Sequence, residues 1–365
     1  MSLLATSLRP CGQMRLVSSS LRRFKTTVNT PKAPPAFAFA FDIDGVLLHG
    51  STPLPGAKKT LDYLNHNKIE YLLLTNGGGL SEAHRVQELS RLLDVPLSTQ
   101  QFVQSHTPFQ RHASSIPRVL VVGGKKDNCR HVASGYGFKD VIIPADVIHT
   151  HPAASPFSEA GAYENIGRTL KGGEKVDAIM VYNDPRDWGS DLQVVVDVLL
   201  SKDGEIGTRR STKEVLEQGH VPIYFSNPDL WWANEYSLPR LGQGGFRAAL
   251  EGVWRAVTGG ELKAETIGKP HTETYRYAEE VLMRWRKERT GDAEIKRVYM
   301  VGDNPASDIR GANGFTQGKA EWVSCLLRTG VFRDGEDDAG AHHIADNVAN
   351  AVMWAVEREK NMGTI

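Results

Sequence analysis

Polar residues follow directly on three apolar segments of this 365-residue sequence. Asp42 and Asp44 come after the run AFAFAF, and Thr75 comes after IEYLLL. Asp303 comes one glycine after RVYMV. The carboxyl ends of parallel strands meet along one crevice of a sheet, and ligands bind in that crevice. We therefore expect these four side chains to converge from distant parts of the chain.

Their types indicate chemistry on a phosphate group. Asp42, Asp44 and Asp303 would crowd three negative charges into the crevice, which is costly without a cation. A site of oxygen ligands with few carboxylates suits Mg²⁺. A lysine and a threonine hydroxyl, together with helix N-termini, suit a bound phosphate.

The rest of the sequence supplies the elements that must position these residues. Short apolar runs predict buried strands at 36–41, 69–74, 118–123, 141–143, 178–182, 223–225, 297–301 and 323–327. Apolar residues at helical spacing and capping signals predict helices at 56–67, 81–93, 191–200, 246–257, 272–286 and 348–357. Strands that alternate with helices predict an α/β protein with parallel sheets.

Four short motifs occur in an order that resembles the haloacid dehalogenase-like (HAD) phosphohydrolases. They are FDIDGVL at Phe41–Leu47, LTN at Leu74–Asn76, GKP at Gly268–Pro270 and VGDNPASDI at Val301–Ile309. Each motif alone is a weak signal, but the ordered set of four identifies the chain as a member of this superfamily.

The long stretch between the second and third motifs leaves room for an inserted cap domain. With Asn227-Pro228-Asp229 and Gly311-Ala312-Asn313, this arrangement resembles class IIA of the superfamily, and within it the mitochondrial branch of the cat eye syndrome critical region protein 5 type. The resemblance implies a Rossmann-like parallel-sheet core with a large inserted α/β cap.

We divide the chain accordingly. Residues 1–35 are expected to be a transit peptide and linker, 36–79 the first part of the core, 80–265 the cap, and 266–365 the second part of the core. The glycines at 77–79 are expected to form a tight turn at the cap hinge.

The resemblance also implies roles for the motif residues. Asp42 would be the nucleophile that forms an aspartyl-phosphate, and Asp44 would protonate the leaving oxygen and later deprotonate water. Lys269 would neutralise charge that grows on the phosphoryl oxygens. The carboxylates of Asp42 and Asp303 and the backbone carbonyl of Asp44 would hold Mg²⁺.

Further residues would support these groups. Thr75 would bind a phosphate oxygen, and Asn76 would either bind a phosphate oxygen or position the turn. Asp308 would orient Lys269 or a water on the metal, with Asn304 beside it in a supporting position.

Cap residues would determine the substrate. Asp229 lies in the segment that returns from cap to core, so we expect it to bind substrate. Trp231 and Trp232 would either form the floor of the substrate pocket or pack in the protein core.

Composition excludes several classes of protein. The 43 basic and 43 acidic residues give a net charge of zero, whereas a nucleic-acid-binding protein would usually show a basic excess. No apolar run approaches the ~18 residues of a membrane span. Cys11, Cys129 and Cys325 are too widely spaced to suggest a disulfide framework or a zinc site.

The first 41 residues differ from the rest of the chain. They contain no Asp or Glu, and they are rich in Ser, Thr and Leu. Their basic residues are Arg9, Arg15, Arg22, Arg23, Lys25 and Lys32. A basic, serine-rich and acid-free N-terminus is typical of a mitochondrial transit peptide. We therefore expect a mitochondrial protein of the matrix, with a disordered basic tail as the alternative interpretation.

The sequence thus predicts a Mg²⁺-dependent phosphatase that acts on a small phosphorylated metabolite. Two alternatives remain open: a phosphotransferase that uses the same aspartyl-phosphate, and an idle binding or regulatory protein on the same fold. Idle relatives usually lose a carboxylate, whereas Asp42, Asp44 and Asp303 are all present. A homodimer is compatible with the sequence, and no residue argues for a role in glycerophospholipid metabolism.

Overall fold

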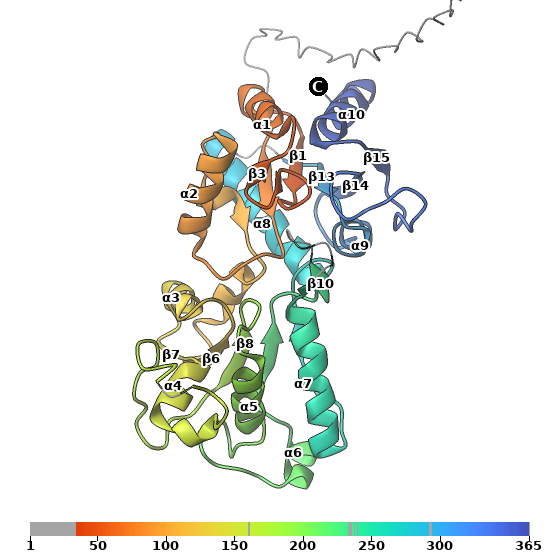
Figure 1. The fold of residues 1–365 in the computed structure, drawn as a ribbon. Coiled ribbons are helices and arrows are strands. Elements are labelled where there is room, and N and C mark those ends of the chain that lie inside the picture. The colour runs from red at the N-terminus through yellow and green to blue at the C-terminus, as the bar shows by residue number, and fades with distance from the viewer. Residues whose placement is uncertain are drawn as a thin grey trace, which may run out of the picture. The chain divides into compact units, whose positions relative to one another are not determined.

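The computed structural model describes residues 34–159, 161–232, 236, 238, 240–291 and 294–364. All but the last two residues of the predicted transit peptide and linker therefore lie outside the described residues. The described part contains two parallel sheets with helices packed on their faces (Figure 1). The predicted α/β class is confirmed, because both sheets are parallel throughout.

The first sheet has six strands in the order β15-β14-β13-β1-β4-β5. Their bounds are β1 (Phe37–Phe41), β4 (Tyr71–Leu74), β5 (Phe102–Val103), β13 (Arg297–Gly302), β14 (Glu321–Leu327) and β15 (His343–Ala345). Helices α1 (Ala57–His66), α2 (Glu82–Leu93) and α10 (Val348–Asn361) cover one face of this sheet, and α8 (Thr272–Thr290) and α9 (Arg310–Gly314) cover the other.

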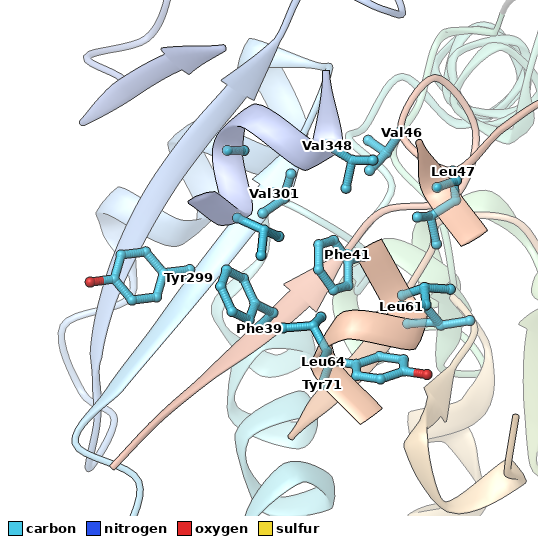
Figure 2. Close-up of a cluster of buried hydrophobic side chains, with 14 of the residues drawn as sticks. Phe39, Phe41, Val46, Leu47, Leu61, Leu64, Tyr71, Tyr299, Val301 and Val348 are labelled. Carbon is cyan, nitrogen blue, oxygen red and sulfur yellow. The ribbon is translucent and has the colours of Figure 1, made fainter. Parts of the chain in front are cut away.

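Strand β1 lies in the middle of this sheet and alternates large and small residues. The phenylalanines Phe37, Phe39 and Phe41 pack into one cluster with α1 and α10 (Figure 2). Ala38 and Ala40 point to the opposite face, where α8 packs. Successive side chains of a strand point to opposite faces, so the run AFAFAF places bulky rings on one side and leaves room for a helix on the other.

The second sheet has five strands in the order β12-β9-β8-β6-β7. Their bounds are β6 (Arg118–Val122), β7 (Asp140–Ile142), β8 (Ala178–Val181), β9 (Ile223–Phe225) and β12 (Glu265–Thr266). Its core clusters include residues of α3 (Asn128–Gly135), α4 (Pro144–Thr150), α5 (Trp188–Leu199), α6 (Thr212–Gln218) and α7 (Gln243–Thr258).

Short elements connect these layers. They are the antiparallel pairs β2 (Leu48–His49) with β3 (Thr52–Pro53) and β10 (Trp231–Trp232) with β11 (Arg240–Leu241), the 3₁₀ turns η1 (Thr99–Gln101), η2 (Thr107–His112) and η3 (Pro152–Ala154), and the π-helical turn η4 (Pro305–Ile309). None of the helices in the described ranges is long and apolar enough to cross a membrane.

Most predicted elements are found. Every predicted strand is present with ends within two residues of the expected ones, and the predicted helices are present with extensions of up to four residues. The predicted boundary between core and cap, at residues 79 and 80, does not coincide with the point where the chain leaves the first sheet. Strand β5 pairs with β4 in the first sheet, through Leu74 and Val103, and Thr266 of β12 pairs with Phe225 in the second sheet.

The sequence analysis placed the hinge at the glycines of residues 77–79. The chain instead completes another helix and strand of the first sheet before it crosses to the second. We therefore propose that the crossings between core and cap follow Val103 and precede Gly268.

Phe39 tests the role of the central strand, because its side chain is fully buried between Phe41 and Tyr299. We expect Phe39→Ala to lower the free energy of unfolding by about 3–5 kcal/mol, since it removes a buried ring and leaves a cavity. Urea denaturation followed by circular dichroism measures this. Phe157→Ala is the matched control, because Phe157 is 100% exposed and its truncation should leave the unfolding curve unchanged.

Candidate active site

The carboxyl ends of β1, β4 and β13 bring together the residues that the sequence predicted. Asp42 directly follows β1, and its backbone N–H donates to the carbonyl of Val301 at 2.9 Å. Asp303 directly follows β13, and Thr75 directly follows β4. Because these strands are neighbours in the sheet, three distant segments of the chain meet at one edge.

A buried lysine lies at the centre of this edge. The ammonium group of Lys269 donates to Asp42 Oδ1 at 2.7 Å, to Asp308 Oδ1 at 2.7 Å and to the carbonyl of Leu74 at 3.0 Å. These three bonds use all the donors of an ammonium group. Burial lowers the pKa of Lys269, but the adjacent carboxylates of Asp308 and Asp42 outweigh it and hold the pKa above its usual value. Lys269 is therefore a fixed positive charge.

Three buried carboxylates surround that charge. Asp42, Asp303 and Asp308 each offer one oxygen, and these oxygens lie within 4.8 Å of one another. Burial raises the pKa of Asp42 well above its usual range, although Lys269 opposes this. Burial and the neighbouring charge of Asp308 raise the pKa of Asp303 to about 7. One lysine does not neutralise three carboxylates, so this donor set fits a hard divalent cation such as Mg²⁺.

Glycines allow the chain to wrap closely around Asp303. A Cβ atom added to Gly45 would lie 2.5 Å from Asp303 Oδ2, and one added to Gly330 would lie 1.8 Å from it. Gly45 also has a φ of 79°, which other residues rarely adopt. The backbone N–H of Val331 donates to Asp303 Oδ2 at 2.7 Å.

The loop of Gly330 and Val331 was missed by the sequence analysis. The one available signal was its position after the apolar run 323–327, which ends at the same edge of the sheet.

Asp308 reaches Lys269 from η4. Its Oδ1 accepts from Lys269, and its Oδ2 accepts from the backbone N–H of Asn304 at 3.1 Å. A Cβ atom on Gly302 would lie 2.2 Å from the Cβ of Asp308, so this close approach requires glycine. The side chain of Asn304 accepts from the N–H of Ala306 at 3.0 Å and caps the turn.

Asn76 joins the Lys269 segment to Asp229 by hydrogen bonds. Its Oδ1 accepts from the backbone N–H of Lys269 at 2.8 Å, and its Nδ2 donates to the carbonyl of Lys269 at 2.9 Å. Nδ2 also donates to Asp229 Oδ2 at 3.1 Å. This geometry favours the positioning role over the phosphate-binding role that the sequence analysis considered.

Asp229 and its neighbour Asn227 reach this edge together. Asn227, which the sequence analysis named only as part of the motif Asn227-Pro228-Asp229, donates from Nδ2 to the backbone carbonyl of Asn76 at 3.1 Å. Burial raises the pKa of Asp229 to about 6, although the hydrogen bond from Asn76 and the charge of Lys269 oppose the shift.

Thr75 and Asp44 remain open to a ligand. The hydroxyl oxygen of Thr75 accepts from the N–H of Gly77 at 2.9 Å, and its hydrogen has no acceptor among the residues that the structure describes. The side chain of Asp44 is exposed. Restricted solvation raises the pKa of Asp44, and the positive charge of Arg85 opposes the shift. Arg85 was not singled out from the sequence, because nothing in its local pattern indicates this position.

The two tryptophans after Asp229 do not pack in the core. Trp231 is 54% exposed and Trp232 is 44% exposed, so the core-packing interpretation is wrong. Their pairing with β11 holds them in a short hairpin segment at the surface instead.

Comparison with known proteins gives consistent results. A family model described as haloacid dehalogenase-like hydrolase matches residues 39–139, and a model described as HAD-hydrolase-like matches residues 266–351. A mitochondrial hydrolase of Saccharomyces cerevisiae is 40% identical over 345 residues, which cover 88% of this chain and 96% of the yeast protein.

Two further proteins are informative. A cardiolipin synthase (CMP-forming)/mitochondrial hydrolase fusion protein of Schizosaccharomyces pombe is 42% identical over 365 residues; the match covers 96% of this chain but only 59% of the fusion protein. The solved structure of a p-nitrophenyl phosphatase from Archaeoglobus fulgidus superimposes with a TM-score of 0.55 at 14% identity, covering 88% of this chain and all of that one. At this identity the superposition shows a shared fold.

The raised pKa of Asp229 generates a prediction about pH. The folded protein holds the proton of Asp229 more tightly than the unfolded chain, whose Asp pKa is about 3.9. Wild-type stability should therefore fall, relative to Asp229→Asn, as pH rises from about 4 through about 6. Thermal unfolding of both proteins at several pH values measures the difference in Tm. A difference that is constant across this range would show that the Asp229 pKa is not raised.

Proposed function

The chain belongs to the haloacid dehalogenase-like hydrolases, and from this premise we propose that it is a Mg²⁺-dependent phosphatase of a small phosphorylated metabolite. The observation that carries the proposal is the contact of Lys269 with Asp42 and Asp308 in a buried, acid-rich edge of the sheet. A nucleophilic carboxylate and a phosphate ester are both anions, so they approach each other only where positive charge is fixed in advance.

Asp42 is the proposed nucleophile. Lys269 holds Asp42 Oδ1, and the hydrogen bonds among the described residues leave Oδ2 available for attack on phosphorus. Attack forms an aspartyl-phosphate and expels the alcohol, and water later cleaves the P–O bond of this acyl phosphate to release inorganic phosphate and restore the carboxylate. The carboxylates of Asp42 and Asp303 and the backbone carbonyl of Asp44 would hold Mg²⁺, which when bound screens the phosphate charge.

Lys269 is proposed to stabilise the transition state. Its ammonium group is buried and already oriented by Asp308, so little reorganisation is needed when negative charge grows on the phosphoryl oxygens. Thr75 would donate its free hydroxyl hydrogen to one of these oxygens.

Asp44 is proposed as the general acid and base. Its raised pKa favours the protonated form that can give a proton to the leaving alcohol, and its exposed carboxyl lies where a leaving group can reach it. After the alcohol leaves, the carboxylate of Asp44 would take a proton from the attacking water.

The substrate is proposed to be selected by cap residues, with Asp229 among them. Asp229 reaches the catalytic edge through Asn76, so it would face the leaving group rather than the phosphate. The fusion of a similar hydrolase region to a cardiolipin synthase in the Schizosaccharomyces pombe relative favours phosphate esters of glycerol or glycerophospholipids among the candidates.

We further propose that the protein works in mitochondria, in the matrix. The acid-free basic segment at the N-terminus and the name of the Saccharomyces cerevisiae relative, a mitochondrial hydrolase, both support this location.

The test of the activity is a phosphatase assay with Mg²⁺ on a panel of phosphorylated metabolites, including glycerol phosphates, compared with Asp42→Asn. We expect Asp42→Asn to lower kcat at least a hundredfold, about 2.7 kcal/mol of barrier, because an amide cannot attack phosphorus. Chelation of divalent ions should abolish wild-type turnover. Asp62→Asn is the control, because Asp62 lies on the exposed side of α1.

The outcomes separate the alternatives. Phosphate released in wild type and lost in Asp42→Asn supports the phosphatase. Phosphate transferred to an added alcohol instead of water would indicate a phosphotransferase. A wild-type protein that turns over no phosphate ester would contradict the proposal and favour the alternative of an idle binding protein.

The location is tested by a fluorescent reporter fused to Met1–Pro35. We expect the fusion to enter mitochondria, since the positive charges of the segment drive import of such peptides. The double change Arg22→Glu and Arg23→Glu should leave the reporter in the cytosol. A wild-type fusion that stays in the cytosol would refute the mitochondrial assignment.

A further inference from the structure

A buried histidine contacts the loop that follows the second motif. His106 is fully buried between β5 and η2, and its Nε2 accepts a hydrogen bond from the backbone N–H of Gly79 at 3.0 Å. Its ring stacks on Tyr182 at 5.3 Å between centroids. A Cβ atom on Gly78 would lie 2.6 Å from the His106 ring, so the loop passes the imidazole more closely than other residues allow.

The hydrogen bonds of this histidine form a directed chain. Since Nε2 accepts from Gly79, it carries no proton, and the neutral ring must carry its proton on Nδ1. Burial lowers the pKa of His106 to about 4, which agrees with a neutral ring. Nδ1 then donates to the hydroxyl oxygen of Tyr136 at 2.8 Å, and that hydroxyl donates to Glu82 Oε1. Each group thus has a defined role as donor or acceptor, and the last acceptor is the carboxylate of Glu82.

The members of this chain come from both sheets. Glu82 begins α2, which packs on the first sheet, and it also accepts from the hydroxyl of Thr107 at 2.7 Å. Tyr136 is the C-cap residue directly after α3, which packs on the second sheet. The series of hydrogen bonds from Gly79 through His106 and Tyr136 to Glu82 is therefore complete only when the end of α3 contacts the start of α2.

The other end of the loop reaches the catalytic lysine. Gly79 lies three residues after Asn76, whose side chain holds both the backbone N–H and the carbonyl of Lys269. Between them, the carbonyl of Gly77 accepts from the N–H of Ser105, next to His106. The loop that contains Asn76 is thus hydrogen-bonded to Ser105 and His106 on the side away from Lys269.

We propose that Tyr136 and His106 are positioning residues, which couple the contact between α3 and α2 to the placement of the loop at residues 75–79 and so of Lys269. Neither side chain touches the reacting atoms. The effect on turnover rests on the proposed phosphatase activity, whereas the effect on the loop does not. When α3 and α2 separate, the hydrogen bond of Gly79 loses its support; when they meet, Lys269 is held for catalysis.

The test compares Tyr136→Phe with the wild-type full chain by hydrogen–deuterium exchange and by kinetics with p-nitrophenyl phosphate and Mg²⁺. We expect the amide of Gly79 to exchange at least fivefold faster, because Tyr136→Phe leaves Nδ1–H without an acceptor and loosens the ring. We expect kcat to fall at least fivefold with KM changed less than twofold, since the loss lies in lysine placement rather than in substrate contacts.

Tyr163→Phe is the matched control. Tyr163 also packs against the second sheet and donates to a carboxylate, Asp187, but it has no hydrogen bond to His106 or the loop. The same removal of a hydroxyl should leave both exchange at Gly79 and kcat unchanged.

A second pair of variants tests the histidine itself. In His106→Gln an amide oxygen can still accept from Gly79, so protection of that amide should be largely retained; in His106→Leu it should be lost. Unchanged exchange at Gly79 in both Tyr136→Phe and His106→Leu would overturn the proposal, as would a kcat loss without faster exchange. If the wild-type protein turns over no phosphate ester, the proposed function fails. The exchange data still decide whether the hydrogen bonds of His106 and Tyr136 position the loop.

Discussion

The structure depends on one buried positive charge and the carboxylates that compensate it. Removing an ammonium group from water costs several kcal/mol, and only close, well-aligned partners recover that cost. Lys269 has such partners in Asp42, Asp308 and the carbonyl of Leu74, each within 3.0 Å. The arrangement still leaves an excess of negative charge once Asp303 is included. That excess is the electrostatic property on which the proposed metal binding and phosphate chemistry would both depend.

The first sheet positions this cluster of charged side chains. Parallel pairing brings the ends of β1, β4 and β13 to one edge, and helices on both faces exclude water from the strands that end there. The alternation of phenylalanine and alanine in β1 lets α8 approach closely on the alanine face. Lys269 precedes α8, so the packing of that helix also sets where the lysine enters the site.

The second sheet reaches the same edge through backbone and amide contacts. Asn76 joins the lysine segment to Asp229, and Asn227 bonds back to Asn76. On the other side of the loop, His106 joins Gly79 to Tyr136 and Glu82. The loop at residues 75–79 therefore contacts both the Lys269 segment and residues that pack on the second sheet. A Cβ atom added to Gly78 would lie 2.6 Å from the His106 ring, and one added to Gly79 would lie 3.0 Å from the Asn183 side chain.

The amino-acid sequence alone determined the α/β class, eight of the strands, and the meeting of Asp42, Thr75, Lys269 and Asp303 at one edge of the first sheet, because short apolar runs and ordered motifs are local signals. It did not determine the pairing of β5 with β4, the exposure of Trp231 and Trp232, or the contacts of Asn76, Val331 and His106. Those depend on which strand pairs with β4 and on how closely separate loops approach. Tertiary structure decides such features, since pairing and burial arise from residues far apart in the chain, where no local pattern records them.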